Sequence, residues 1–154
     1  MIDVRCAVLE DLLELVALEA SFPDGQRWGE SSWRDEVLGP RRHVLVCPGR
    51  PGLEAAATFS FSGDVVDLHR IVTSTAARRR GLGRRLMGAG IAWAREMGAN
   101  RMLLEVEATN APALSLYEGA GFHRISERRD YYAPGVHAAV LERDIPAVGE
   151  GEPS

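Results

Sequence analysis

The sequence predicts an α/β fold built on one mixed sheet with flanking helices. Its 154 residues suffice for one domain with a sizeable core but not for two, and 45% apolar with 26% charged residues is typical of a globular chain. Strand-like and helix-like segments alternate, and one strand–helix–strand unit requires a parallel strand pair. We expect a single domain over residues 1–145 and a flexible tail, rich in Gly, Pro and Glu, over residues 146–154.

The first half of the chain predicts two short helices and four strands. Leucines recur at near-helical spacing from Leu12 to Leu18 with acids between them, which is typical of an amphipathic helix that ends before Gly25. A second helix is expected from Ser31 to Gly39. Strands are expected over residues 3–8, 43–47, 53–62 and 65–73, the last two joined as a hairpin at Gly63-Asp64.

The second half predicts the parallel unit. Apolar residues at steps of four, three, four and four from Leu82 to Met97 form one face of a long helix that ends at Gly98. Residues 101–107 then alternate as a strand, with Met102, Leu104 and Val106 on one face and Leu103, Glu105 and Glu107 on the other. Asn110 caps a further helix that ends at Gly119, and strands over residues 123–129 and 136–143 follow.

The charges are unevenly distributed. All 18 basic residues are arginine, so phosphate-loop lysines, Schiff bases and lysine general bases are excluded. From Leu68 to Arg95 there are seven arginines and no acid, within a chain of net charge −4. One basic segment in an acidic protein predicts that a single anion is bound and disfavours a nucleic-acid surface. Arg70 and Arg95 are assigned no role and are expected to be solvated.

Other site classes are not indicated. Cys6 and Cys47 stand apart and are expected to be buried free thiols. The four histidines lack metal-ligand spacing, so no metal is expected. No apolar run is long enough to span a membrane, and the opening residues lack the layout of a signal peptide, so we expect a cytoplasmic protein without a membrane partner.

The segment from Arg78 to Gly83 is the candidate binding loop. It follows a strand that ends near Thr73 and precedes the long helix, so backbone N–H groups, the positive end of the helix dipole and arginine side chains meet there. A phosphate site is one interpretation, and a solvated helix start is the other. A dinucleotide fingerprint is disfavoured because its third glycine would fall at Leu86.

The motif Arg78-x-x-Gly81-x-Gly83 resembles the acyl-CoA pyrophosphate motif of the GCN5-related N-acetyltransferases, the GNAT family. Further motifs are similar in order and spacing to those of bacterial ribosomal-protein alanine N-acetyltransferases. The likeness is close from Val66 to Tyr132 and loose over the first 60 residues, where it rests on Phe22-Pro23, Trp28 and Trp33. The later motifs are Leu104-Glu105-Val106, Asn110, Leu116-Tyr117-Glu118, Gly121-Phe122 and Arg128-Arg129-Asp130-Tyr131-Tyr132.

This resemblance implies a role for each matching residue. Glu105 corresponds to the general base that deprotonates the acceptor amine, and Tyr117 to the general acid that protonates the leaving thiolate. Acetyl passes directly from thioester to amine, so no covalent enzyme intermediate is needed. Acetyl-CoA would be bound by Ile71, Val72 and Thr73 on the strand, by Arg78, Arg79, Arg80, Gly81, Leu82, Gly83 and Arg84 in the loop, and by Asn110.

Each of these residues also has a plainer interpretation. Glu105 could be a carboxylate on a wet sheet face, Tyr117 a core residue, and Asn110 only a helix cap. Trp28, Tyr131 and Tyr132 are assigned to the acceptor site but could be core or rim aromatics. Two departures from the relatives' pattern are His137, where an acid is expected, and Thr73-Ser74-Thr75, which replaces Val-Asp-Pro. The first puts the acceptor in question, and the second alters the approach to the loop.

The resemblance implies the GNAT acyl-CoA N-acyltransferase fold, a mostly antiparallel central sheet with one parallel splayed pair and flanking helices. It also implies an acetyl-CoA-dependent N-acetyltransferase acting on a primary amine, first of all the α-amine of a protein such as a ribosomal protein. The enzymatic alternatives are a small-molecule amine or a protein lysine as acceptor. A non-catalytic sensor that binds acyl-CoA is the alternative from another class. A monomer or weak homodimer is expected.

Overall fold

The computed structural model describes residues 3–147 of the chain, which divide into two compact units. The first unit holds the residues up to Ser60 together with His69–Gly90, and the second holds Phe61–Leu68 and the residues from Ile91 onward. The helices are α1 (Leu12–Leu18), α2 (Glu30–Leu38), α3 (Leu82–Glu96) and α4 (Ala111–Gly119). The strands are β1 (Arg5–Cys6), β2 (Arg42–Pro48), β3 (Leu53–Ser62), β4 (Val65–Thr73), β5 (Arg101–Glu107), β6 (His123–Ala133) and β7 (Val136–Asp144).

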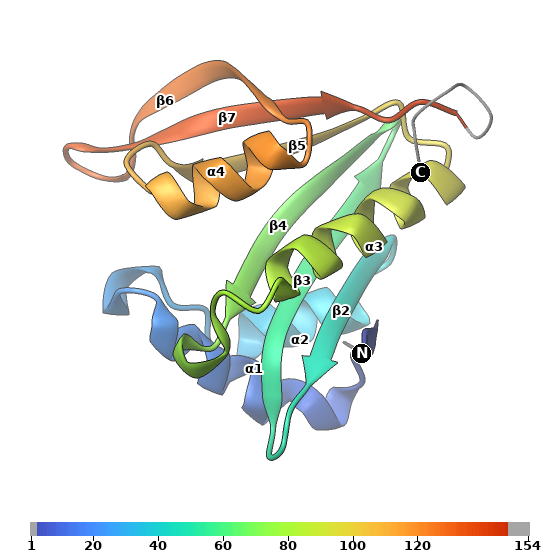
Figure 1. Ribbon diagram of the computed structural model, residues 1–154. Coiled ribbons are helices and arrows are strands. Elements are labelled where there is room, and N and C mark those ends of the chain that lie inside the picture. The colour runs from blue at the N-terminus through green and yellow to red at the C-terminus, as the bar shows by residue number, and fades with distance from the viewer. Residues whose placement is uncertain (1–2, 148–154) are drawn as a thin grey trace. The chain divides into compact units, whose positions relative to one another are not determined.

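The strands hydrogen-bond in the order β1-β2-β3-β4-β5-β7-β6, which confirms the predicted mixed sheet (Figure 1). The expected parallel pair is β4 and β5, joined from Val65 opposite Arg101 to Leu68 opposite Leu104. The pairs β1–β2, β2–β3, β5–β7 and β6–β7 are antiparallel. Because β4 and β5 are connected through α3, the segment β4–α3–β5 has the strand–helix–strand topology that the sequence predicted.

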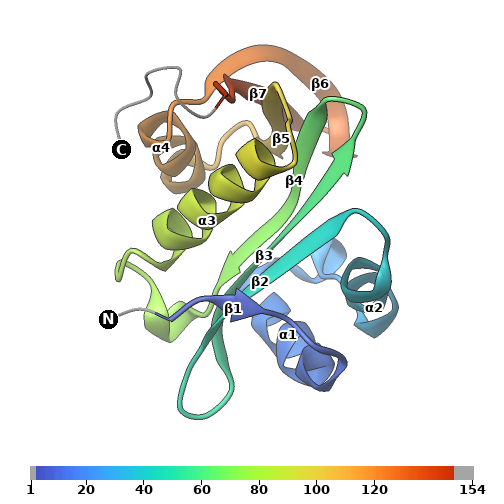
Figure 2. The ribbon, with the colours of Figure 1, turned by 90° about the vertical axis from the view of Figure 1, so that its right-hand side faces the viewer.

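In the first unit, β2 and β3 are covered on both faces (Figures 1 and 2). Val44 and Val46 of β2 pack with the buried leucines of α1 and with Trp33 of α2. The alternate residues face the other way, toward α3, where Gly90 lies against the ring of Phe59 on β3. A Cβ at position 90 would overlap that ring, so the close approach of helix and strand requires glycine there.

In the second unit, β7 lies between β5 and β6. The alternation predicted for β5 is confirmed, because Met102, Leu104 and Val106 are buried while the residues between them are partly exposed. Leu141 of β7, opposite Leu104, is buried with them. β6 is exposed along nearly its whole length, so β5 and β7 supply the buried strands of this unit.

Several expectations need correction. The opening strand is only Arg5–Cys6, because a 3₁₀ turn begins at Leu9 and ends the extended segment early. Cys6 is exposed at this strand, so the prediction that both thiols are buried is wrong for Cys6 and confirmed for Cys47. β6 continues past Arg129 to Ala133. Of the predicted tail, only Pro146 and Ala147 are described, and residues 148–154 lie outside the described part. Within residues 3–147, no helix is long and apolar enough to cross a membrane.

Candidate active site

The loop before α3 has an unusual backbone. Arg79 and Gly81 both have positive φ, of 67° and 78°. Gly81 adopts this conformation without cost, whereas arginine does so rarely. α3 begins at Leu82, and the N–H of Arg85 donates to the carbonyl of Gly81. The N–H groups of the residues before Arg85 precede the helical hydrogen-bond ladder and are available to an anion.

The side chains of this loop supply cationic groups. Arg80 donates from Nη1 to Oε1 of Glu54 on β3 at 2.9 Å. Arg78, Arg79 and Arg84 form no ion pair with any residue in the described part of the chain. Three uncommitted guanidinium groups at a helix N-terminus are a suitable arrangement for a pyrophosphate. The assignment of residues 78–84 to the cofactor stays a prediction.

The end of β4 leads into this loop. Val72 is buried against the helices α1 and α2, so only its backbone is available to a ligand, whereas Ile71 and Thr73 are partly exposed. The N–H of Ser74 donates to the carbonyl of Glu54, which fixes the approach to the loop. Ser74 and Thr75 also line a cavity of about 290 Å³, together with Glu14 and Ser21 among others.

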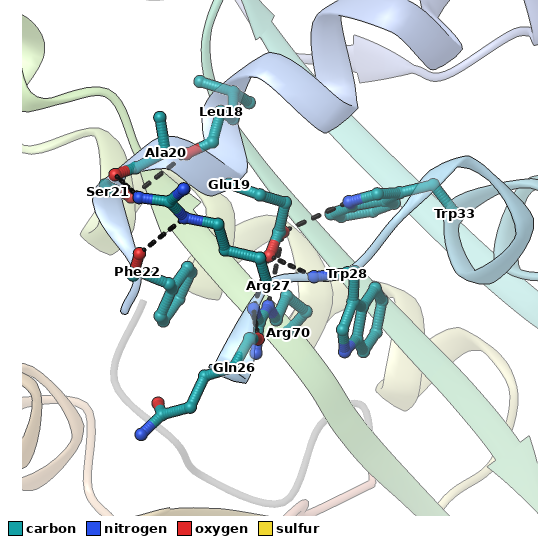
Figure 3. A network of polar contacts seen from close by, with 10 residues as sticks. All are labelled: Leu18, Glu19, Ala20, Ser21, Phe22, Gln26, Arg27, Trp28, Trp33 and Arg70. Carbon is teal, nitrogen blue, oxygen red and sulfur yellow. Dashed lines mark hydrogen bonds and ion pairs between the residues drawn. The ribbon is translucent and has the colours of Figure 1, made fainter. Parts of the chain in front are cut away.

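Arg70 on β4 belongs to a buried network, so the expectation that it is solvated is wrong (Figure 3). Its guanidinium forms an ion pair with Glu19, whose side chain is 1% exposed. Glu19 also accepts hydrogen bonds from the N–H of Trp28 at 2.9 Å and from Nε1 of Trp33 at 3.1 Å. Arg70 in turn donates to the carbonyl of Gln26. The pair thus holds the segment between α1 and α2 against β4.

Aromatic rings complete this network. The guanidinium carbon of Arg70 lies 3.8 Å from the ring centroid of Phe22 and 5.0 Å from that of Trp28. Trp28 and Trp33 pack edge to face, with centroids 5.1 Å apart. Trp33 is fully buried and therefore a core residue, whereas Trp28 is partly exposed. The acceptor-binding role of Trp28 stays a prediction.

A second polar chain links three elements of the first unit through His69, to which the sequence assigned no role. In the tautomer with hydrogen on Nδ1, His69 donates to Glu36 of α2 and accepts from Ser60 of β3, both at 2.9 Å. Thr58 also donates to Glu36 at 2.7 Å. Burial opposes ionisation of Glu36, but these hydrogen bonds prevail and lower its pKa. Ser60 is buried, so its hydroxyl is not an exposed nucleophile, and the hydrogen-bond network serves to join α2, β3 and β4.

In the second unit, Glu105 on β5 is held by two side chains of β6. Its Oε1 accepts from Nη1 of Arg128 at 2.7 Å. Tyr131 is the other partner: a hydrogen bond with Glu105, followed by burial, raises the pKa of the Tyr131 phenol. The guanidinium carbon of Arg128 lies 4.5 Å from the ring centroid of Tyr131, which in turn packs edge to face on Tyr132. Glu105, Arg128 and Tyr131 are called the carboxylate cluster below.

Tyr117 and Asn110 lie on α4 and at its start. Asn110 caps the helix as predicted, because its Oδ1 accepts from the N–H of Ala113 at 3.2 Å. Tyr117 is 5% exposed and packs edge to face on Phe122, so the packing that its plainer interpretation required is present. The catalytic role of Tyr117 and a cofactor contact of Asn110 stay predictions.

His137 has a structural role at the β6–β7 hairpin. Its Nδ1 accepts from the N–H of Asp130 at 2.9 Å, and Oδ1 of Asp130 accepts from the N–H of Gly135 at 2.7 Å. Asp130 has a positive φ of 54°, and the β6–β7 register shifts between Arg128 and Ala133. These bonds shape the segment that carries Tyr131 and Tyr132.

Sequence reasoning missed several contacts. Arg95 is not simply solvated, because its Nε donates to the carbonyl of Pro146 at 3.2 Å. The partners of Arg70, His69 and Glu105 lie on other elements, and only the arrangement of charged residues across the fold could have revealed them. Within residues 3–147, no group of three His, Cys, Asp or Glu side chains could hold a metal ion.

Comparisons with known proteins agree with the resemblance seen in the sequence. The sequence model of the acetyltransferase (GNAT) family matches residues 9–122. The N-alpha-acetyltransferase RimI of Mycobacterium tuberculosis is 31% identical over 97% of this chain and 88% of that protein. The ribosomal protein bS18-alanine N-acetyltransferase of Salmonella typhimurium is 39% identical over 84% of this chain and 92% of that protein.

Solved structures agree as well. The crystal structure of the ribosomal-protein-S18-alanine N-acetyltransferase from Escherichia coli covers 100% of both chains with a TM-score of 0.86 and 26% identity. The structure of Arabidopsis thaliana NAA60 in complex with acetyl-CoA has a TM-score of 0.83, at 16% identity over 94% of this chain and 99% of that chain. The second likeness concerns the fold alone.

Proposed function

Because the chain belongs to the acetyltransferase (GNAT) family, we propose that it acetylates the α-amine of a protein N-terminus, with an N-terminal alanine of a ribosomal protein as the first candidate. Membership of this family confirms the predictions of fold, acetyl transfer and acetyl-CoA as co-substrate. One observation carries the choice of acceptor: relatives named for acetylating the alanine of ribosomal protein bS18 match most of this chain at up to 39% identity.

The residues of the first unit suit acetyl-CoA. Arg78, Arg79 and Arg84 have no ion-pair partner among residues 3–147, so they can neutralise a pyrophosphate without first breaking a contact. The positive φ values of Arg79 and Gly81 are found in backbone turns that direct N–H groups at anions. We assign the pyrophosphate to Arg78–Arg84 and the pantetheine arm to the backbone of Ile71–Thr73.

The reaction transfers acetyl from a thioester to an amine. An α-amine with a pKa of about 8 is mostly protonated at neutral pH and must lose a proton before it attacks. We assign Glu105 to accept that proton, directly or through water, since it is a partly exposed carboxylate on the open face of β5. We assign Tyr117 to return a proton to the leaving thiolate of CoA. Counted from the ammonium form, the nitrogen gains the acetyl carbon and loses two protons, the first to Glu105 before attack and the second as the tetrahedral intermediate collapses and the C–S bond breaks. The sulfur gains one proton from Tyr117, and the net reaction releases one proton to solvent.

The acceptor is assigned to three aromatic side chains, Tyr131, Tyr132 and Trp28. Tyr131 is nearly half exposed, the guanidinium that pairs with Glu105 lies over its ring, and Tyr132 packs on it. Trp28 lies in the segment held by Glu19 and Arg70. These observations support an acceptor role for the three aromatics without excluding a small amine or a lysine as the acceptor.

The test is release of CoA thiol from acetyl-CoA in the presence of Ala-initiated peptides, lysine peptides or small amines. We expect the Ala-initiated peptides to react, and Glu105→Gln to lower kcat by about 100-fold or more at unchanged acetyl-CoA affinity. Glu107→Gln is the matched control, because Glu107 lies on the same strand face and contacts Thr109. Equal turnover in wild type and Glu105→Gln would remove Glu105 from the role of base. Acetyl-CoA binding without thiol release for any amine would indicate a sensor instead.

A further inference from the structure

We propose that Arg128 is a positioning residue that serves as the displaceable counter-ion of Glu105. The cationic acceptor amine binds to Glu105 by replacing the Arg128 guanidinium. This inference rests on the proposed function, because it specifies how the acceptor reaches the carboxylate assigned as base. It concerns only the carboxylate cluster of β5 and β6, within the second unit.

The strand register places Arg128 and Glu105 on one face of the sheet. Ala138 of β7 is opposite Glu107 of β5 on one side and opposite Arg128 of β6 on the other. Residues directly opposite share a face, and so do residues two apart on a strand, so Glu105, Glu107 and Arg128 all point the same way. The arginine therefore reaches diagonally over β7, and the small side chain at Ala138 leaves room for it. The resulting bond from Nη1 to Oε1 is 2.7 Å long.

Both partners of Glu105 in the carboxylate cluster come from β6. Arg128 supplies the ion pair and its guanidinium stacks over the ring of Tyr131, whose pKa is raised by Glu105. An amine that approaches Oε1 of Glu105 therefore meets a carboxylate that already carries a cation. The guanidinium occupies one acceptor position of that oxygen, and its positive charge opposes the approach of a second cation, so the amine binds most favourably when the guanidinium moves away.

The guanidinium can move at little cost. The Arg128 side chain is 54% exposed and that of Glu105 is 29% exposed, and exposed ion pairs contribute little to stability because water competes for both partners. The β6–β7 register is irregular directly after Arg128, so the neighbouring backbone is not held in a regular ladder. These features distinguish a displaceable contact from a structural one.

The incoming amine is a suitable replacement for arginine. A free α-amine is mostly an ammonium at neutral pH and offers the same charge and N–H donors as the guanidinium. Exchange of one cation for another keeps the carboxylate paired throughout. A peptide with a blocked, neutral N-terminus cannot compete in this way, so the exchange selects for free amines.

The test compares the affinities of two peptides by calorimetry: an Ala-initiated peptide with a free amine and the same peptide N-acetylated. Arg128→Ala removes the competing cation, so we expect the free-amine peptide to bind about two- to fivefold more tightly than to wild type, with the acetylated peptide unchanged. Arg128→Lys keeps the charge and should lie near wild type. In turnover assays, Arg128→Ala should lower KM for the peptide while kcat changes by less than about twofold.

Arg124→Ala is the matched control, because Arg124 is an exposed β6 arginine paired with Glu127 rather than with Glu105. Equal affinity in wild type and Arg128→Ala would reduce the contact to an ordinary surface pair, and weaker binding would make Arg128 a direct ligand of the acceptor; either result overturns the proposal. A wild type that binds neither peptide overturns it too. If the affinities change as expected but no amine is acetylated, the proposed function fails while the exchange stands.

Discussion

Two arginine–glutamate pairs of this protein have the same chemistry in different surroundings. Arg70 and Glu19 lie in the first unit, with the arginine against Phe22 and Trp28. Arg128 and Glu105 lie in the second, with the arginine over Tyr131. The exposed fractions of the two side chains are 14% and 1% in the first pair, but 54% and 29% in the second.

Burial decides what each pair can do. Glu19 has its remaining acceptor sites filled by Trp28 and Trp33, so opening the pair would leave charges and donors unsatisfied out of water. Glu105 and Arg128 are both accessible to solvent, so water can hydrogen-bond to either side chain when the pair opens. The first pair therefore fixes a segment of the fold, and the second is suited to open and close during binding.

The largest expected effect is on the buried pair. Glu19→Gln leaves the Arg70 guanidinium without its counter-ion, and we expect the free energy of unfolding to fall by about 3–5 kcal/mol in urea titrations. The control is Glu30→Gln, which breaks an exposed helical pair with Arg34 and should change stability by less than about 0.5 kcal/mol. A fall no larger than in the control would show that burial does not decide the role of the pair.

A double variant of the same pair separates the contribution of the Arg70 charge to stability from that of its packing. Adding Arg70→Met to Glu19→Gln removes the stranded cation, while the amide oxygen at position 19 keeps one of the two tryptophan N–H bonds that the carboxylate oxygens accept in wild type. The double variant should therefore unfold at a higher urea concentration than Glu19→Gln alone. A lower midpoint would mean that the arginine contributes mainly by packing on Phe22 and Trp28.

A pair of intermediate exposure tests whether the effect is graded. Arg5 is 44% exposed and Asp11 only 6%, and two hydrogen bonds from the guanidinium, opposed by burial, lower the pKa of Asp11. Asp11→Asn should lower the free energy of unfolding at pH 7 by about 1–2 kcal/mol. Because the folded pKa lies below that of the unfolded chain, this contribution is present above the unfolded pKa and is lost as the pH falls through the folded one. Urea titrations from pH 7 down to pH 3 should show the difference from wild type shrinking, and a constant difference would contradict the ion-pair origin.

The smallest effect is expected for the exposed pair. Arg128→Ala should leave the urea midpoint of unfolding close to that of wild type, because water replaces the guanidinium at Glu105. The same variant is expected to alter peptide affinity, so stability and binding separate at this position. A loss of stability comparable with that of Glu19→Gln would make the carboxylate cluster a structural element like the buried pair.

Local patterns predicted most of the fold. β3, β4 and β5 have the predicted bounds, because an apolar-rich segment flanked by turn residues defines each strand, with strict alternation added in β5. β1 is shorter than predicted because its end depends on a 3₁₀ turn that has no clear local signal. Asn110 and the face of Glu105 were likewise predictable, since capping and alternation are local rules.

The site could be predicted only where its residues lie in order along the chain. The loop at Arg78–Gly83 carries a recognisable motif, but no local motif identifies the partners of Arg70 and His69 on the preceding strand. Glu19 is 51 residues from Arg70, and Glu36 is 33 residues from His69, so the folded arrangement alone brings them together. From the sequence alone, neither the arginine nor the histidine has an evident partner. In the folded chain, each of them joins separate elements through hydrogen bonds and ion pairs.

The two residues that interact with Glu105, Arg128 and Tyr131, both lie on β6, so substitutions in this one strand can change the acceptor specificity. Nearly every residue of this strand is exposed, and exposed strand positions tolerate substitution with little effect on stability. Arg128 and Tyr131 can therefore be exchanged for other side chains while the buried strands β5 and β7 keep their packing. A library confined to β6 is accordingly a practical starting point for redirecting such an enzyme to a different amine.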